Sequence, residues 1–314
     1  MKYSAGGPHH FLRDVAVVFV VGVLFFVLPV ELLAYRAQNN FLWKRQHLEA
    51  NLGSISTLLL GNSFFELSFN NHVLGDSSFN VSQMGRQIYY DVEIARRYIP
   101  RMPNLRTVIY PIAVGGLSVG GSDLNSGVEY AKSWHIPCRT FPQNILCHSQ
   151  LLSGRFCLKN YLPDIRCDSL GYQALSGVWK GEIVAGYDRP TLNHKSAVEG
   201  FIIYLTRLAR ICSENGVRFI AITPPQTNLY VDWTPEANYD DLSRVVQTVQ
   251  AAYPMEYHDY SRDAEFRNNS LFYDPVHLTH VGATRLAERV AEDFNLSVDH
   301  PYIAHEKWLS ADLN

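Results

Sequence analysis

The stretch Leu58-Leu59-Leu60-Gly61-Asn62-Ser63-Phe64-Phe65-Glu66 decides the fold. Its apolar first part, with Ile55 before it, is typical of a buried parallel strand that ends at Gly61. The residues after Gly61 are compatible with a helix, which places Ser63 at the carboxyl end of the strand, near backbone N–H groups. The stretch therefore predicts an α/β domain with a serine at the carboxyl edge of its sheet, where such folds bind their ligands. A simpler interpretation is that Asn62 or Ser63 only caps the helix.

Strand and helix patterns alternate along most of the chain. Apolar runs predict strands at 55–60, 79–81, 107–112, 217–223 and 257–260, and amphipathic periods predict helices at 89–99, 196–215, 240–252 and 279–294. This alternation indicates a mainly parallel sheet with helices on both faces. Residues 118–193 interrupt it, because they are rich in Gly, Ser, Pro and Cys and show no long period. We interpret them as an insertion.

Composition excludes two broad classes. Hydrophobic residues make up 47% of the 314 residues, which favours a folded chain over a disordered one. The net charge is -3 and no basic run stands out, so a nucleic-acid partner is not expected.

The N-terminal region contains an uncharged apolar run from Val15 to Val30, which continues beyond Glu31. A helix of about 20 such residues crosses a bilayer. We expect an uncleaved membrane anchor at 1–38, a linker at 39–53 and one domain at 54–314. A cleaved signal peptide and a buried core helix are the alternatives. Neither is favoured, because no good small-x-small cleavage site follows the run and the run has no polar face. Basic residues flank both ends, so the positive-inside rule does not orient it.

Four of the five cysteines lie within thirty residues: Cys138, Cys147, Cys157 and Cys167. Two disulfides or a zinc site would explain the cluster, and disulfides are favoured because no C-x-x-C pair is present. Disulfides need an oxidising compartment, which agrees with an outward-facing domain. Cys212 lies in an apolar helix pattern and is expected to be a buried thiol.

The second chemical segment is Phe272-Tyr273-Asp274-Pro275-Val276-His277-Leu278-Thr279. A serine nucleophile needs a base, and the base needs an acceptor that orients it. Asp274 and His277 can share one loop, with the carboxylate on one ring nitrogen and Ser63 on the other. Otherwise His277 is a packed surface residue and Asp274 forms a turn. A metal site with His280 is disfavoured because no further ligand cluster is visible, so no metal is expected.

With Gly61-Asn62-Ser63 and Asp274-Pro275-Val276-His277 in this order, the chain resembles the SGNH/GDSL hydrolase superfamily. That family has a Gly-Asp-Ser-like block after the first strand and an Asp-x-x-His block before the last helix. The resemblance covers roughly Ser54 to Leu296 without the insertion. It implies a flavodoxin-like three-layer α/β sandwich with a mainly parallel sheet.

The resemblance also implies oxyanion donors after the second and third strands. Gly85 is the candidate donor after the second strand, with Ser82 or Gln83 as alternatives. The family asparagine after the third strand is missing, since the sequence there reads Ala-Val-Gly-Gly. A backbone N–H of Gly115 or Gly116 would have to replace it.

The anchor brings the chain closer to envelope-facing members of the superfamily, loosely like the D-alanyl transfer protein of teichoic-acid modification and alginate-type O-acetylation proteins. This implies an extracytoplasmic serine esterase or O-acyltransferase that needs no cofactor. Ser63 would be the nucleophile and, through its N–H, an oxyanion donor, with His277 as base and Asp274 as its orienter. The expected partners are an envelope polysaccharide or an acylated small molecule, and a membrane-bound acyltransferase. The alternative is a catalytically degenerate scaffold or binding protein, which the missing asparagine favours.

Overall fold

The computed structural model describes residues 8–117, 124–139, 147–148, 163–181 and 195–298. The chain divides into two compact units, one of Met1–Leu42 with Asp123–Ile165 and the other of Trp43–Ser122 with Arg166–Asn314. Residue 157, one of the four clustered cysteines, lies outside the described residues.

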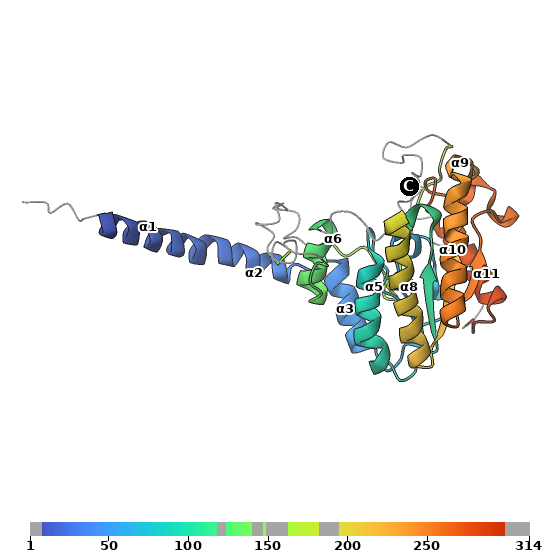
Figure 1. Cartoon of the computed structure of the whole chain (residues 1–314), viewed down its shortest axis with the longest axis horizontal. Coiled ribbons are helices and arrows are strands. Elements are labelled where there is room, and N and C mark those ends of the chain that lie inside the picture. Colours follow the sequence, from blue (N-terminus) through green and yellow to red (C-terminus); the bar gives the residue numbers. More distant parts are fainter. Residues whose placement is uncertain (1–7, 118–123, 140–146, 149–162, 182–194, 299–314) are drawn as a thin grey trace, which may run out of the picture. The chain divides into compact units, whose positions relative to one another are not determined.

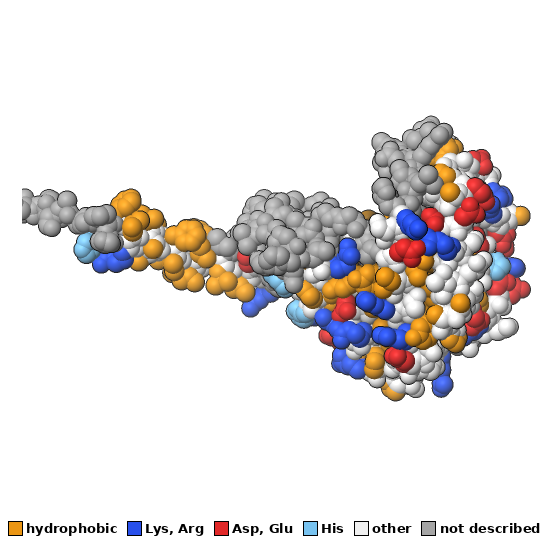
Figure 2. Space-filling view, in the orientation of Figure 1, with side chains coloured by type: hydrophobic (Ala, Val, Ile, Leu, Met, Phe, Trp, Pro, Cys, Tyr) orange, Lys and Arg blue, Asp and Glu red, His pale blue; other side chains and the backbone are white. Residues whose placement is uncertain are grey.

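The first unit begins with a long helical segment made of α1 (Pro8–Gly22), a π-helical turn (Val23–Val27) and α2 (Leu28–Arg36). The π-helical turn comes just before Pro29, whose missing N–H cannot continue the regular helical hydrogen bonds. From His10 to Leu33 the helix is long and apolar enough to cross a membrane. Hydrophobic side chains cover it in the view of Figure 2. A signal sequence near the N-terminus would have the same length and composition.

The first unit also contains α6 (Leu124–Glu129), a second π-helical turn (Tyr130–Trp134) and a small apolar cluster. Cys138 and Cys147 are buried in this cluster, where the Cys138 N–H donates to the Cys147 Sγ over 3.4 Å. The prediction of two disulfides is not supported, because the cysteines that the structure describes are thiols. Even spacing in the sequence indicates a cluster, but it does not bring the sulfur atoms together in bonding geometry.

The second unit is built on a five-stranded parallel sheet with the order β2-β1-β3-β4-β5 (Figure 1). The strands are β1 (Thr57–Leu59), β2 (Ser78–Asn80), β3 (Thr107–Pro111), β4 (Arg218–Thr223) and β5 (Glu256–Asp259). This is the flavodoxin-like order of doubly wound sheets. It confirms the predicted α/β fold class with a mainly parallel sheet.

Helices cover the sheet. The main ones are α5 (Ile88–Tyr98), α8 (Lys195–Glu214), α10 (Glu236–Ala252) and α11 (His280–Asp293), with the short helices α4 (Ser63–Glu66) and α9 (Asn228–Trp233). Of these, α5, α8 and α10 pack side by side (Figure 1). Because β3 is buried at every position, its sequence from Val108 onward is an unbroken apolar run rather than an alternating pattern.

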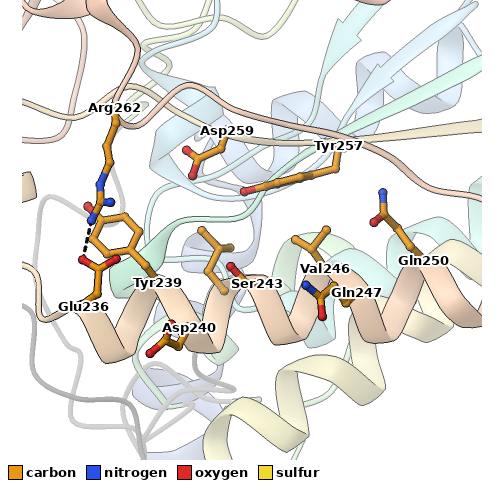
Figure 3. Close-up of a pocket in the computed structure, with 11 residues that line it drawn as sticks. Glu236, Tyr239, Asp240, Ser243, Val246, Gln247, Gln250, Tyr257, Asp259 and Arg262 are labelled. Atoms are coloured by element: carbon orange, nitrogen blue, oxygen red, sulfur yellow. Dashed lines mark hydrogen bonds and ion pairs between the residues drawn. The ribbon is translucent and has the colours of Figure 1, made fainter.

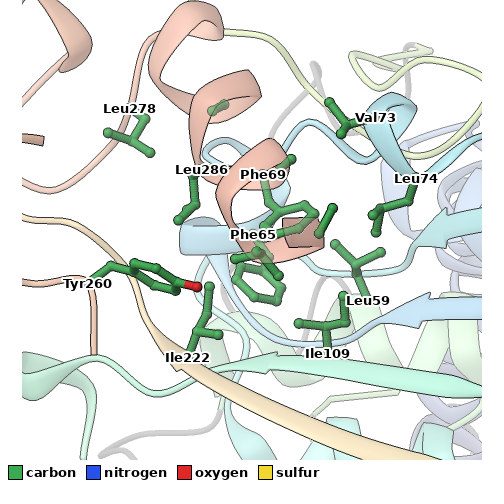
Figure 4. Close-up of a cluster of buried hydrophobic side chains, with 14 of the residues drawn as sticks. Leu59, Phe65, Phe69, Val73, Leu74, Ile109, Ile222, Tyr260, Leu278 and Leu286 are labelled. Carbon is green, nitrogen blue, oxygen red and sulfur yellow. The ribbon is translucent and has the colours of Figure 1, made fainter. Parts of the chain in front are cut away.

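The largest described core cluster joins one sheet face to α4 and α11 (Figure 4). Leu59, Ile109 and Ile222 contribute from neighbouring strands, Phe65 from α4 and Leu286 from α11. This packing holds the helix that begins at Ser63 firmly against the sheet. It therefore fixes the position of the serine relative to the strand that precedes it.

The stretch expected as a linker contains α3 (Asn40–Ala50). Lys44 and Leu48 on this helix are completely buried, each at 0% exposure. The burial of the Lys44 charge is offset by its ion pair with the Glu66 carboxylate, which belongs to the same unit. Part of the expected linker is thus folded into the domain.

Residues 166–181, from the expected insertion, run along the second unit. The Asn80 N–H of edge strand β2 donates to the Leu170 carbonyl, and the Trp179 N–H donates to the Phe272 carbonyl. A Cβ at Gly171 would lie 2.1 Å from the Asn80 oxygen, so this close approach needs a glycine. The segment thereby covers the edge of β2 and contacts the loop that leads to Asp274.

Candidate active site

The nucleophile candidate lies where the sequence pattern placed it, at the carboxyl end of β1. The Asn62 side chain caps α4 by accepting the Phe64 N–H over 3.1 Å. Because Asn62 performs the capping, the Ser63 hydroxyl is not used for it. The Ser63 side chain is half-buried.

Gly61 lets the chain make this turn. Its φ is +126°, and a Cβ there would lie 2.5 Å from Pro111 Cδ on β3. Any larger residue would be strained and would collide with the neighbouring strand. The glycine of the nucleophile block is therefore required by the close approach of β1 and β3.

Ser63, His277 and Asp274 form one hydrogen-bonded chain. Ser63 Oγ lies 2.9 Å from His277 Nε2, and His277 Nδ1 lies 2.7 Å from Asp274 Oδ2. The second carboxylate oxygen, Oδ1, accepts the N–H groups of Val276 and His277 over 2.9 and 2.8 Å. The short Asp-x-x-His spacing thus lets one loop hold both the acid and the base.

The hydrogen bonds assign the histidine tautomer. An ionised Asp274 can only accept, so Nδ1 of His277 carries the proton and Nε2 accepts from the Ser63 hydroxyl. The Phe64 ring lies 5.8 Å from the His277 ring, centroid to centroid, which limits how the imidazole can turn. This arrangement is suited to general-base activation of a serine.

The loop Ser82–Arg86 follows β2 and carries the predicted donor Gly85. The N–H groups of Ser82, Gln83 and Met84 donate to Asn80 Oδ1, the Gly61 carbonyl and Glu66 Oε2. The Arg86 N–H donates to the Gln83 carbonyl. Among the residues that the structure describes, none accepts the Gly85 N–H, and the same holds for the Ser63 N–H. These two amides are available to a developing oxyanion, which disfavours Ser82 and Gln83 as the donor.

The third predicted donor, Gly115, lies in the 3₁₀ turn Val114–Gly116 that follows β3. The Gly116 N–H closes this turn onto the Ala113 carbonyl over 2.9 Å, so Gly116 is not the better choice. The turn takes the place of the asparagine block, at the same carboxyl edge of the sheet as Ser63.

Sequence reasoning missed two buried ion pairs beside this site. Lys44 pairs with Glu66 over 3.1 Å, and Arg86 pairs with Asp91 over 2.9 Å. Burial raises the pKa of Asp91, while the Arg86 guanidinium acts in the opposite direction. For the second pair the sequence contains one indication, because Asp91 is a charged residue on the otherwise apolar face of α5.

His280 does not join His277 and Asp274. Its Nδ1 instead lies 3.3 Å from the Tyr172 hydroxyl. Burial lowers the pKa of His280, and the nearby His72 acts in the same direction. Within the described part of the chain, no group of His, Cys, Asp or Glu side chains is arranged to hold a metal ion.

A polar pocket of about 410 Å³ lies elsewhere in the second unit, between α10 and β5 (Figure 3). Tyr239 and Glu236 line it from α10, and Tyr257 and Asp259 from β5. Arg262 pairs with Glu236 and stacks over the Tyr239 ring. No member of the Ser63 hydrogen-bonded chain lines this pocket, so it is separate from the candidate active site.

Comparisons with known proteins concern the fold. A protein-family profile matches residues 191–298. No curated protein sequence matches the chain. The chain resembles a protein provisionally described as a platelet activating factor from Streptococcus pneumonia, with 10% identity and a TM-score of 0.43 over 80% of this chain and 90% of that chain.

Two further solved structures are similar. One is a provisionally assigned acylhydrolase from Bacteroides fragilis, with 12% identity and a TM-score of 0.42 over 81% of this chain and 94% of that one. The other is a GDSL-like lipase from Bacteroides thetaiotaomicron, with 10% identity and a TM-score of 0.42 over 81% of this chain and 98% of that one. At this identity the activity of the present chain does not follow from either neighbour.

Proposed function

We propose that this chain is an extracytoplasmic serine esterase or O-acyltransferase that acts on an acylated polymer or glycan of the cell envelope. The observation that carries the proposal is the continuous hydrogen-bonded chain from Ser63 through His277 to Asp274. The amides of Ser63 and Gly85, which have no acceptor among the described residues, support it, since acyl transfer needs donors for an oxyanion.

In the acylation step, Ser63 Oγ attacks the ester carbonyl carbon while His277 Nε2 takes the hydroxyl proton. The carbonyl electron pair moves onto the oxygen, where the Ser63 and Gly85 N–H groups stabilise the charge, with Gly115 as a further candidate. Asp274 stabilises the imidazolium through its bond to Nδ1. The intermediate then expels the leaving alcohol, which takes the proton from His277, and an acyl-serine remains.

In the second step the acyl-serine passes its acyl group to water or to a hydroxyl group. His277 removes the proton of the incoming hydroxyl and later returns it to Ser63 Oγ. Water as the acceptor makes the protein an esterase, and a sugar hydroxyl makes it an O-acyltransferase. In the second case a membrane-bound acyltransferase would be a natural partner that supplies the acyl group.

A fluorophosphonate probe tests the proposal on the full-length protein in detergent. Wild type should be labelled at Ser63, whereas Ser63→Ala should take up no probe and remain folded. His277→Ala should be nearly as severe, and Asp274→Asn should retain roughly ten- to a hundred-fold more activity than either. The control is Ser54→Ala, which removes an exposed serine hydroxyl and should be labelled like wild type.

The second candidate is a binding or scaffold protein that kept the fold without turnover. The 3₁₀ turn in place of the asparagine block favours it, because loss of one oxyanion donor costs about 10²- to 10³-fold in kcat. If wild type takes up no probe and Ser63→Ala leaves the cellular function intact, the enzyme proposal is refuted and the scaffold is the better account.

A further inference from the structure

The oxyanion loop, Ser82–Arg86, lies between two ion pairs that are removed from solvent. The side chains of Lys44 and Glu66 are 0% and 1% exposed, and those of Arg86 and Asp91 are both 0% exposed. Burying four charges is costly unless each is paired and hydrogen-bonded. Each pair contacts a group that borders the candidate active site.

The first pair holds the start and middle of the loop. Lys44 Nζ donates to the Ser82 carbonyl as well as to Glu66 Oε1. The other carboxylate oxygen of Glu66 accepts the Met84 N–H. Glu66 is the last residue of α4, the helix that begins at Ser63, so this pair ties the loop to the helix of the nucleophile.

The second pair holds the end of the loop. Asp91 Oδ1 accepts both Arg86 Nη1 over 2.9 Å and the Gly61 N–H over 3.0 Å. The Tyr110 hydroxyl of β3 approaches Asp91 Oδ2 at 3.4 Å. One buried carboxylate thus connects the loop that carries Gly85 to the turn that precedes Ser63.

Together the pairs account for the orientation of the loop. The other loop amides donate to side chains or carbonyl groups of the second unit, whereas the Gly85 N–H has no acceptor in the part of the chain that the structure describes. Gly85 has φ +69°, and among the described residues a Cβ there would meet no atom within 4 Å, so its surroundings there are open. An amide in such a position can face an incoming oxyanion without first breaking another bond.

We propose that Lys44–Glu66 and Arg86–Asp91 are positioning pairs that hold the N–H groups of Gly85 and Ser63 as a preformed oxyanion hole. This inference rests on the proposed acyl-transfer function. Well-packed apolar residues are often as stable as a buried ion pair, so stability alone does not account for two such pairs beside one loop. Donors fixed before the reaction cost no reorganisation when charge develops, which gives the pairs a catalytic effect.

The variants must avoid leaving one charge buried without its partner, since an unpaired buried charge is strongly destabilising. We therefore choose the double variants Lys44→Met/Glu66→Gln and Arg86→Met/Asp91→Asn, which remove both charges of a pair. The matched control is Val249→Ala on α10, a fully buried position that lowers stability without touching the loop. Assays are run on full-length protein, at a temperature where all variants are folded.

The first readout is hydrolysis of a small activated acetate ester. Each double variant should lose about 10- to 100-fold in kcat with little change in KM, because loosened donors weaken only the transition state. The shape of the pH–rate profile should not change, since the residues of the Ser63 hydrogen-bonded chain are not altered. Val249→Ala should keep its kcat. The proposal is overturned if both double variants stay within about twofold of wild type, or if Val249→Ala loses as much kcat as they do.

The second readout, amide hydrogen exchange, does not depend on activity. In wild type the amides of Gln83, Met84 and Arg86 should exchange slowly and that of Gly85 quickly. The double variants should lose protection across the loop while α10 keeps it. Unchanged loop protection would overturn the positioning role even in an active enzyme. Wild type that exchanges as expected but neither takes up fluorophosphonate nor cleaves esters would refute the proposed function while leaving the structural role of the pairs in place.

Discussion

Adjacent residues at the nucleophile turn have different roles. Gly61 makes the turn, Asn62 caps the helix, and Ser63 is left with its hydroxyl on His277. An asparagine stands here where the resembled family usually has an aspartate, and it caps the helix without adding a charge near Ser63. Substitutions at Gly61 or Asn62 should therefore act mainly on folding, whereas substitution of Ser63 should act mainly on chemistry.

At the residue scale, His280 predicts a pH dependence of stability. Burial lowers its pKa below the ordinary value of 6.5, so the unfolded chain binds more protons than the folded one in the window between the two pKa values. Unfolding free energy should be constant above this window and should fall as pH drops through about 6.5. Asp168 lies nearby and opposes the shift, while His72 reinforces it.

Urea unfolding from about pH 8 to about pH 5.5 measures this dependence. His280→Gln should reduce the slope, because the titrating group is gone. Tyr172→Phe should keep most of it, because the hydroxyl is removed while the histidine stays buried. Equal slopes for wild type and His280→Gln would show that other groups control the acid sensitivity.

At the element scale, the contact between the ends of β1 and β3 should tolerate no added side chain. Gly61→Ala combines φ +126° with a Cβ 2.5 Å from Pro111 Cδ, and should cost about 2–5 kcal/mol of unfolding free energy. Ser63 labelling should fall as well, because the turn that presents it must shift. Gly53→Ala is the control, since a Cβ there meets nothing within 4 Å, and should stay within about 0.5 kcal/mol. Equal urea midpoints for the two variants would contradict this account.

At the scale of the whole molecule, the apolar helix predicts in which cell fraction the protein is found. The helix from His10 to Leu33 should keep full-length protein in the membrane pellet after an alkaline wash, and deletion of residues 1–36 should release it. The deletion has to stop before α3, because Lys44 on that helix belongs to the buried pair with Glu66.

N-terminal sequencing of the natural protein separates the anchor from the signal-peptide alternative. An anchor predicts that the apolar helix is retained in the mature protein. A mature chain that begins after residue 36 and stays in the soluble fraction would contradict it. Protease protection in intact cells then reports on which side of the membrane the second unit lies, a question that the flanking basic residues leave open.

Local patterns were enough for the order of strands and helices, for the apolar N-terminal helix and for the expectation that Ser63, His277 and Asp274 lie within hydrogen-bond reach of one another. Each of these depends on neighbouring residues, such as an apolar run ending in glycine or an acid and a histidine three positions apart. The same patterns were misleading in two places. The spacing of the clustered cysteines does not give the distance between their sulfur atoms, and the polar composition of residues 39–53 does not indicate that Lys44 is buried. Only the tertiary structure pairs Lys44 with Glu66 and Arg86 with Asp91, and leaves the Gly85 amide without an acceptor among the residues it describes. The physical reason is that a buried charge or amide is satisfied by whichever group the fold brings near, and that group can lie anywhere along the chain.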